Sequence, residues 1–507
     1  MKIDFELLED PKLQFGEYFE YEDAKTGLAE FGPFGKNIPG LHKREINIGV
    51  IGTGELITKV QDWLSRCSRY IESENIKTKK VGDKFNKDSL FYGDLNLLPP
   101  EYFRMSKILN RDFPGFNIDT SFESCFQLNP RWERHLESRE LKSILEISGK
   151  QERILKLVDF LIDKLASISE NSPAPDIVII AITPEIEESA DTVRVSGNFF
   201  LNLRHALKAR AMQLRNAIPI QLIRASTLDE DVNKRELQEV ATRAWNFCVA
   251  QYYKAEGIPW RPLTLDQDTC YIGVSFYIAQ EKDVGLTMRS SIALAFDFLG
   301  QGLLLRGDEF EWDKEAYGKT PHLTKEAASR LIQNTLAEFT KLRNMPPKRV
   351  VIHKSSEFWG ADRVHHDEVD GFYEGIDSIY HGIEIDLVAL RQTGIRLFRE
   401  GNYPPLRGMH FTFENKEHFL YTMGYIPYLE TYPQSYVPEP WQLVQHIGGS
   451  SPKQLFREVL ALTKMNMNNC SYADGTPITI SFAKKIGEIM KHVPSDGIVL
   501  PHYRFYM

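Results

Sequence analysis

The stretch DIVIIAIT at residues 176–183 is a short run of mostly branched apolar residues, typical of a strand buried on both faces of a sheet. A linker rich in serine and proline, SENSPAPD (169–176), precedes it, and the acidic loop TPEIEESAD follows it. The sequence then predicts a helix at 198–216, a strand at IPIQLIRA (218–225) and a helix at about 236–256. This alternation of strand and helix indicates a parallel α/β sheet.

The same alternation is present upstream. EINIGVIGTGEL (45–56) predicts a buried strand, a glycine turn and a helix at 55–69, and another helix is expected at about 149–167. The turn contains Gly52 and Gly54, but a full dinucleotide fingerprint needs a third glycine and an acidic residue about 20 positions later. An ordinary tight turn is therefore favoured, and an α/β nucleotide-binding protein that uses both glycines is an alternative. Residues 1–45 predict an extended lead-in that wraps another part of the protein.

Downstream of Trp260 the pattern changes. Strands are predicted at 270–280 and within 288–308, followed by a long amphipathic helix at 324–343 and a strand at 348–356. The elements expected after these are a helix near 368–379, strands at 382–392 and 410–415, and helices at 452–465 and 478–492. Strands followed by a mixed sheet with helices on it predict an RNase H-like domain.

Composition limits the class of protein. The 507 residues allow about three domains at roughly 150 residues each. A net charge of −9 argues against a protein coated in positive charge, but it leaves room for a local basic groove. The five cysteines form no C-x-x-C pair, which argues against a structural zinc site. Their odd number, in a sequence without a signal peptide, favours a reducing cytosol. Without a signal peptide or an apolar run of 18 residues, we expect a cytoplasmic protein with no membrane span.

The most informative chemistry lies in LNLRHALKARAMQLRNAIPIQLIR (201–224), which holds five cations and no acid. On a helix, Arg204 and Lys208 share one face four residues apart, where like charges repel by a few tenths of a kcal/mol. An anion between them removes that cost. Gln221 adds an amide at the next strand and Lys254 a cation on the next helix, so these groups could enclose a terminal phosphate. A solvated basic helix face is the alternative that spacing alone leaves open.

The segment WNFCVAQYYKAEGIPW (245–260) carries Asn and Lys on a helix that ends in K-x-x-G-x-P-W, and it resembles the MID domain of Argonaute proteins. The resemblance implies a pocket for the 5′-phosphate of a guide strand, with Mg²⁺. The family often has glutamine where Ala250 stands here, and Gln251 is adjacent. In some relatives the terminal carboxylate, here that of Met507, enters the pocket as a metal ligand. The residues placed in the phosphate pocket by this resemblance are Arg204, His205, Lys208, Gln221, Asn246, Gln251 and Lys254.

The C-terminal half is similar to the PIWI domain of the same family. The matching segments are GYIPYLETYP (424–433), VPEP (437–440), LTKMNMNN (462–469) and GTPITISFAKKIGEIM (475–490). The implied fold is a Rossmann-like MID domain followed by an RNase H-like PIWI domain. We expect a lead-in at 1–45, the MID domain at 46–262 and the PIWI domain at 263–507. Because no room is left for the N and PAZ domains of a long Argonaute, the chain resembles a short prokaryotic Argonaute.

The resemblance also bears on catalysis. Family members that cut nucleic acid carry an acid where CYIGVSFY has Ser275 and another where VVIHKSSEF has Ser355, and the tail HYRF offers Phe505 at a third position. Serine cannot supply the anionic ligands that a pair of divalent metals requires. We therefore expect no cleavage and no catalytic residue in this chain. A metal-dependent endonuclease is the alternative, and the acids that could rebuild its site are Asp297, Asp308 and Asp362.

Short Argonautes of this kind resemble members of two-protein bacterial defence systems. The resemblance implies that a guide RNA directs recognition of invading single-stranded DNA. The implied partner combines an APAZ region with an effector domain, here a TIR NADase, with a sirtuin-type or nuclease effector as the alternative. Target binding would activate this heterodimer, which oligomerises, and NAD hydrolysis would reside in the partner chain. The expected outcome is abortive infection.

Overall fold

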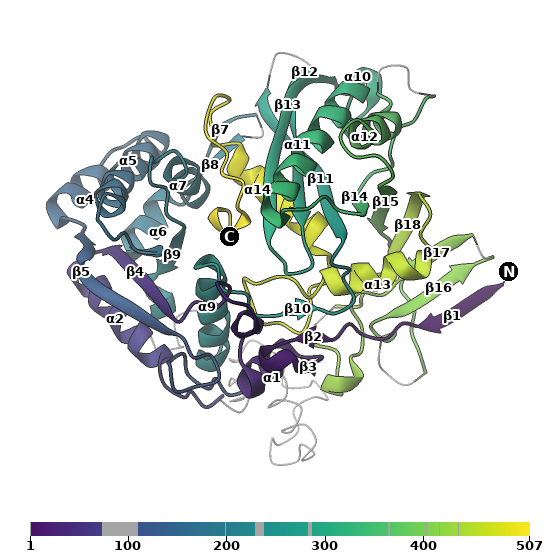
Figure 1. The fold of residues 1–507 in the computed structure, drawn as a ribbon. Coiled ribbons are helices and arrows are strands. Elements are labelled where there is room, and N and C mark those ends of the chain that lie inside the picture. The colour runs from purple at the N-terminus through teal and green to yellow at the C-terminus, as the bar shows by residue number, and fades with distance from the viewer. Residues whose placement is uncertain are drawn as a thin grey trace, which may run out of the picture.

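The computed structural model describes residues 2–73, 110–197, 199–228, 238–281, 286–362, 366–400, 404–414, 416–433 and 436–507, with only the backbone for 279–281 and 286–290. These residues form two α/β units that stand side by side, with the C-terminus between them (Figure 1). Within these ranges, no helix is both long enough and apolar enough to cross a bilayer.

The first unit contains a four-stranded sheet in the order β5-β4-β6-β9, in which all neighbours are parallel. Successive residues of the buried central strand β6 face opposite sides. Ile177 and Ile179 pack with α2 and α9, whereas Val178 and Ile180 pack with α5 and α7. The sheet is therefore covered on both faces, as the alternation predicted. Its elements are β4 (Glu45–Gly52), α2 (Gly54–Cys67), β5 (Cys125–His135), α4 (Ser138–Leu145), α5 (Lys150–Ser169), β6 (Ile177–Ile182), α6 (Pro184–Ala190), β9 (Ile220–Arg224), α8 (Ala225–Leu228) and α9 (Val240–Lys254).

The glycine turn after β4 is an ordinary strand-to-helix turn. Thr53 caps α2 by accepting a hydrogen bond from the Leu56 amide at 3.4 Å. Gly52 lies against Ala181 of the neighbouring strand, where a Cβ atom would come within 3.2 Å of the alanine side chain. Close packing between β4 and β6 therefore accounts for the glycine without a bound nucleotide.

The helix predicted at 198–216 is shorter than the sequence indicated. Residues Thr192–Ser196 (β7) and Phe199–Asn202 (β8) form a hairpin, and α7 covers only Leu203–Ala211. The Asn202 side chain accepts a hydrogen bond from the His205 amide at 3.1 Å, so it begins the helix as its N-cap. This cap fixes Arg204, His205 and Lys208 in the first two turns of α7.

The second unit is built on a nine-stranded mixed sheet in the order β1-β16-β17-β18-β15-β14-β11-β12-β13. Its centre, β11, β14 and β15, is parallel, and β12 and β13 are antiparallel. Helices α11 and α12 cover one face, and α13 and α14 pack on the other. This is the predicted RNase H-like arrangement. Its elements are β11 (Thr269–Glu281), β12 (Leu286–Phe296), β13 (Gly302–Asp313), α10 (Lys314–Tyr317), α11 (Lys325–Arg343), β14 (Arg349–Lys354), α12 (Glu368–Asp377), β15 (Glu384–Gln392), β16 (Met409–Phe413), β17 (Glu417–Leu420), β18 (Trp441–Ile447), α13 (Pro452–Leu462) and α14 (Ile478–Met490).

The N-terminal lead-in connects the two units. Its first strand, β1 (Ile3–Leu7), is the last strand of the nine-stranded sheet, and β2 (Leu13–Gln14) and β3 (Glu20–Tyr21) form a small sheet with β10 (Arg261–Pro262), followed by α1 (Ala24–Phe31). Buried charges hold it in place, because Asp10 accepts from Arg407 at 2.9 Å and lies 3.1 Å from the ammonium of Lys464. These contacts fasten the start of the lead-in to the second unit.

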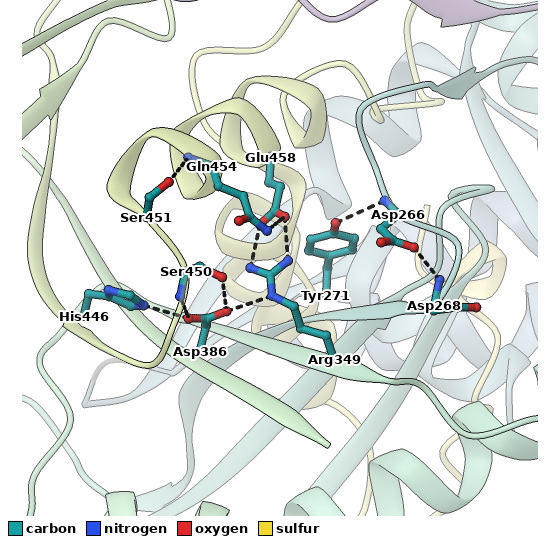
Figure 2. Close-up of polar contacts among 10 residues, drawn as sticks. All are labelled: Asp266, Asp268, Tyr271, Arg349, Asp386, His446, Ser450, Ser451, Gln454 and Glu458. Atoms are coloured by element: carbon teal, nitrogen blue, oxygen red, sulfur yellow. Dashed lines mark hydrogen bonds and ion pairs between the residues drawn. The ribbon is translucent and has the colours of Figure 1, made fainter. Parts of the chain in front are cut away.

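A buried ion network fastens α13 to the sheet (Figure 2). The Arg349 guanidinium donates to the Asp386 carboxylate at 2.8 Å and to both Glu458 oxygens at 2.6 and 3.2 Å. His446 and Ser450 also contact Asp386, each at 2.7 Å. Burial alone would raise the pKa of Asp386, but the bonds from His446, Ser450 and Arg349 hold it below its usual value. Each charge in this network has an opposite charge within the protein.

Candidate functional site

A cavity of about 480 Å³ lies where the two units meet. Helices α7 and α9 and strand β9 contribute from the first unit, and α14, the loop at 466–469 and the C-terminal tail contribute from the second. Six of the seven residues assigned to a phosphate pocket line it together, and Lys254 does not. The lining side chains are Arg204, His205, Lys208, Gln221, Asn246, Phe247, Ala250, Gln251, Asn466, Asn468, Asn469, Phe482, Lys485, Ile486, Ile489, Tyr506 and Met507.

Lys208 is the buried cation of this cavity, with 2% of its surface exposed. Its ammonium donates to the Tyr506 carbonyl at 3.2 Å and contacts the carbonyl oxygen of Met507. Burial, followed by the nearby charges of Arg204 and Lys254, lowers the pKa of Lys208 well below its usual value. Within the described ranges no Asp or Glu side chain forms an ion pair with Lys208, Arg204 or Lys254.

Lys254 lies behind Gln221 rather than on the cavity wall. It is fully buried, and its ammonium contacts the Gln221 side-chain oxygen and donates to the Ile220 carbonyl at 3.3 Å. Burial, with a smaller contribution from Arg204, lowers the pKa of Lys254 to about 7. The placement differs from the expected direct contact because α9 turns Lys254 towards β9. Lys254 therefore positions the Gln221 side chain, which lines the cavity, rather than lining the cavity itself.

The amides of α9 divide into two roles. Asn246 already has partners at both amide atoms, since it donates to Gln238 at 3.0 Å and accepts from the Cys470 amide at 2.8 Å, which joins the two units. Gln251 is buried and lines the cavity, yet neither its oxygen nor its nitrogen has a hydrogen-bond partner among the described residues. An unpaired buried amide costs about 1–3 kcal/mol. A ligand in the cavity would satisfy it.

His205 contributes no positive charge at neutral pH. Burial is the main cause, and the neighbouring His492, Arg204 and Lys208 add to it, so that the pKa of His205 falls to about 4. Its ring lies 5.9 Å from the ring of His492 in an edge-on arrangement. A neutral imidazole here offers a hydrogen bond or a stacking face.

The second unit adds polar groups that sequence reasoning did not assign to the site. Asn466, Asn468, Asn469 and Lys485 line the cavity opposite α7. The amide-rich run TKMNMNN was noted in the sequence only as a segment at the end of the fold. The repeated asparagines of this run are close to a chain end that is expected to reach the pocket. They are the sequence feature that could have indicated that this run lines the cavity.

The two serines at the degenerate catalytic positions lie at the same end of neighbouring strands, Ser275 within β11 and Ser355 directly after β14. Strands β11 and β14 are parallel neighbours with Gly273 opposite His353, and Ser275 and Ser355 each follow two residues later. The Ser275 hydroxyl is buried without a hydrogen-bond partner in the described part of the chain, and Ser355 is exposed. Phe505 is buried in the core, in the tail that leads to the cavity.

The acids that could replace the missing ligands have other positions or partners. Ser275 pairs with Ile292, so Asp297, five residues along β12, is about 17 Å away at a strand rise of about 3.4 Å. Asp308 bonds Arg330 at the surface at 2.7 Å, and Asp362 is exposed. In the nearby α12, Glu368 is held by buried Lys354, with both carboxylate oxygens at 2.7 Å. The described residues contain no group of three His, Cys, Asp or Glu that could hold a metal ion.

Comparison with solved structures shows which known fold this architecture matches. The chain is similar to Clostridium butyricum Argonaute bound to a guide DNA and a 19-mer target DNA (TM-score 0.56, 17% identity, covering 98% of this chain and 54% of that one). It is also similar to A. aeolicus Argonaute (0.54, 14%, 98% and 54%) and to Drosophila Piwi (0.54, 11%, 99% and 56%). The sequence matches no protein-family model and no curated protein. The fold is thus the MID–PIWI fold of Argonaute proteins, and the chain spans about half the length of these structures.

Proposed function

We propose that the cavity binds the phosphorylated 5′ end of a guide strand, through which the protein recognises a complementary target. The observation that carries this proposal is the group of cations at Arg204, Lys208 and Lys254, with which no Asp or Glu side chain pairs in the described ranges, beside the unsatisfied amide of Gln251. Arg204 is exposed, but Lys208 and Lys254 are buried, and the terminal oxygen of Met507 is the one group at a chain end that Lys208 contacts. Burying cations with so little counter-charge is costly. A phosphate supplies both the missing negative charge and acceptors for the donors.

The donor set also fits a divalent cation. Mg²⁺ prefers oxygen ligands and is commonly held by one or two protein groups together with phosphate oxygens. Two protein groups of the cavity could contribute oxygens: the Gln251 amide, whose oxygen has no partner in the described part of the chain, and the terminal carboxylate of Met507, one oxygen of which already contacts Lys208. When bound, the ion would neutralise phosphate charge, while Lys208 and Arg204 orient the phosphate.

We extend the proposal to the biological role on the basis of the resemblance. The guide is RNA and the target is invading single-stranded DNA, so base pairing supplies the specificity and the protein reads backbone charge and shape. Target binding activates an associated APAZ-containing effector, best matched by a TIR NADase, and the heterodimer oligomerises in the cytoplasm. The coupling requires a two-state element that target binding biases.

We propose further that this chain does not cut its target. Ser275, on the central strand β11, and Ser355, directly after the neighbouring strand β14, stand where the resemblance calls for anionic metal ligands. In the described residues near them, Glu368 is neutralised by Lys354, and Asp297 is too distant along β12. The proposal predicts that a guide and target remain intact with purified protein in Mg²⁺ or Mn²⁺. Cleavage that a single Asp-to-Ala change abolishes would instead establish an endonuclease.

The decisive experiment compares a 5′-phosphorylated oligonucleotide of about 20 nucleotides with its 5′-hydroxyl twin in Mg²⁺. One charge-assisted contact is worth about 1.5–3 kcal/mol, or roughly 10- to 100-fold in affinity. We expect Lys208→Ala to remove a preference of that size. Arg210→Ala is the matched control, because Arg210 lies on the same helix but is exposed and pairs with Asp159 at 3.0 Å. An equal loss in both variants, or no phosphate preference in the wild type, would refute the pocket.

The effector part of the proposal needs its own test. The protein would be co-expressed with its APAZ partner, and NAD consumption measured with guide alone, with guide and matched target, and with guide and mismatched target. We expect NAD loss only with the matched target. If the cavity binds the guide 5′-phosphate but no NAD is consumed, the guide-binding proposal stands and the NADase effector is rejected.

A further inference from the structure

The C-terminal end of α14, in the second unit, reaches the start of α7, in the first. His492 lies two residues beyond α14, and its Nε2 atom accepts a hydrogen bond from the Asn202 backbone amide at 3.3 Å. Its Nδ1 atom donates to the Glu488 carbonyl, four residues earlier, at 3.0 Å. Figure 1 shows the β7–β8 hairpin, which ends at Asn202, beside α14. One side chain therefore joins the two units at the point where α7 begins.

The two contacts of His492 require one form of its imidazole ring. A carbonyl oxygen can only accept a hydrogen bond, so Nδ1 carries a proton, and a backbone amide can only donate, so Nε2 has a free lone pair. The neutral ring with its proton on Nδ1 meets both conditions. Burial is the main influence on the pKa of His492 and lowers it, which favours this neutral form.

The Asn202 amide is available to His492 because it lies on the open edge of β8. In the β7–β8 hairpin the Leu203 amide donates to the Asp191 carbonyl at 3.0 Å. Hydrogen-bonded residues alternate along an antiparallel pair, so the amide of Asn202 points away from β7. The Phe200 carbonyl, two residues earlier on the same edge, also lies beside the His492 ring. The imidazole therefore covers the free edge of β8.

Asn202 in turn determines where α7 begins. Its side-chain oxygen accepts from the His205 amide at 3.1 Å, and its side-chain nitrogen donates to the Thr192 hydroxyl at 2.8 Å. With the bond to His492, the capping residue is held by its own helix, by β7 and by the second unit. Such a cap satisfies the first amides of a helix and fixes how the chain enters it.

The first two turns of α7 carry cations that line the cavity. Arg204 and Lys208 lie in these turns, and Lys485 and Ile489 of α14 line the cavity as well. The helix that forms one wall of the cavity therefore also holds, through His492, the start of the helix that forms another. His492 itself does not line the cavity.

We propose that His492 is a positioning residue for the guide 5′-phosphate. By accepting the Asn202 amide it fixes the cap from which the Arg204 and Lys208 side chains project. Supporting residues of this kind hold the contacting groups in the geometry that binding requires. This role rests on the guide-phosphate function proposed above, and it makes phosphate binding by the first unit depend on a residue of the second.

The test compares three variants that differ in where they place a hydrogen-bond acceptor. Glutamine extends about as far as Nε2, asparagine only about as far as Nδ1, and phenylalanine keeps a ring without nitrogen. The quantity measured is the ratio of affinities for the 5′-phosphorylated oligonucleotide and its 5′-hydroxyl twin in Mg²⁺ at pH 7.5. We expect His492→Phe and His492→Asn to lower this ratio by about three- to tenfold, the worth of one ordinary hydrogen bond. His492→Gln should remain within about twofold of the wild type.

The outcomes separate this role from the pocket itself. A wild type without phosphate preference would refute the pocket and the role of His492 together. A wild-type preference that His492→Phe retains would refute the role of His492 alone. An equal loss in all three variants would also overturn it, because packing of the ring, and not the acceptor, would then be responsible. Affinity for the 5′-hydroxyl oligonucleotide should be the same in all four proteins, which shows that the variants are folded.

Discussion

Two regions of this protein bury cations in opposite ways. In the second, PIWI-like unit, Arg349 at the start of β14 lies between the carboxylates of Asp386 and Glu458 (Figure 2). At the MID–PIWI junction, Lys208 contacts the Tyr506 carbonyl and the terminal oxygen of Met507, and Lys254 contacts the Gln221 amide, with no Asp or Glu side chain paired to either lysine in the described ranges. The first arrangement is complete without a ligand. The second has a deficit of negative charge that an external anion would supply.

The pKa shifts follow the same division. Hydrogen bonds from Glu458 and Asp386 outweigh burial and raise the pKa of Arg349. Burial lowers the pKa of both Lys208 and Lys254, and their neighbouring cations lower it further. A buried cation with paired carboxylates therefore indicates a structural role, whereas a buried cation beside other cations and neutral amides indicates a binding role.

The largest expected effect is on stability. Arg349→Met would leave two buried carboxylates without a counter-charge, and breaking such a pair costs about 3–5 kcal/mol of unfolding free energy. Lys208→Met leaves no Asp or Glu side chain unpaired and frees only the terminal oxygen of Met507, beside the remaining cations Arg204 and Lys254, so it should cost clearly less unfolding free energy than Arg349→Met, about 1 kcal/mol or below. Urea denaturation of both variants measures the contrast. Equal destabilisation would show that Lys208 is a structural cation and would remove the basis of the comparison.

A second variant tests whether the charge deficit causes binding. Gln221→Glu would place a carboxylate beside Lys254, whose ammonium already contacts the Gln221 oxygen. The cavity would then resemble the Arg349 network, and affinity for a 5′-phosphate should fall by about 10- to 100-fold, the worth of one or more charge-assisted contacts. Affinity for the 5′-hydroxyl oligonucleotide should hardly change. Gln213→Glu is a control, because Gln213 follows α7 by two residues and bonds Ile498 outside the cavity.

Much of this organisation could be predicted from the sequence because it depends on local pattern. The buried strand at 176–183, the helix at 324–343 and the Arg204–Lys208 spacing each need only neighbouring residues. The features that were missed depend on distant partners. Strand β1 is defined by pairing with β16, about 400 residues later in the chain. β5, an edge strand interrupted by Pro130, shows no simple alternation of apolar and polar residues.

The same reasoning explains the partial success at the site. Helical spacing placed Arg204 and Lys208 on one face of α7, and the resemblance added His205, Gln221 and α9. Neither could show that Lys254 turns behind Gln221, because that depends on how α9 packs against β9. The asparagines at 466–469 come from the second unit, so their place in the cavity follows only from how the two units meet.

The pH dependence of guide binding should reflect the charge deficit. Burial holds the pKa of Lys254 at about 7, so its ammonium loses its proton as the pH rises from 7 to 9. Because a phosphate favours the charged form, affinity for the 5′-phosphate should fall by up to about tenfold per pH unit over that range. The 5′-hydroxyl oligonucleotide should show no such trend. Binding titrations at pH 7, 8 and 9 check this, and a flat profile would contradict it.

The unbound protein should show the opposite trend in stability. An unfolded lysine keeps the ordinary pKa of about 10.4, so between pH 7 and 10 the unfolded chain binds more protons than the native chain at this position. The Lys254 contribution to unfolding free energy therefore rises with pH through this window. Lys254→Met removes that contribution, and urea midpoints of wild type and variant should converge as the pH increases.

The smallest expected effect distinguishes neutral from charged contacts within the cavity. The pKa of His205 is about 4, so its ring is neutral at pH 7.5 and offers at most one ordinary hydrogen bond, worth about 0.5–1.5 kcal/mol. His205→Asn should thus reduce affinity for the 5′-phosphate by about two- to tenfold, less than the effect of Lys208→Ala. The ratio of wild-type to variant affinity should be the same at pH 5.5 and 7.5. A ratio that increases at pH 5.5 would show that the bound phosphate raises the pKa of His205 and makes it a third charged contact.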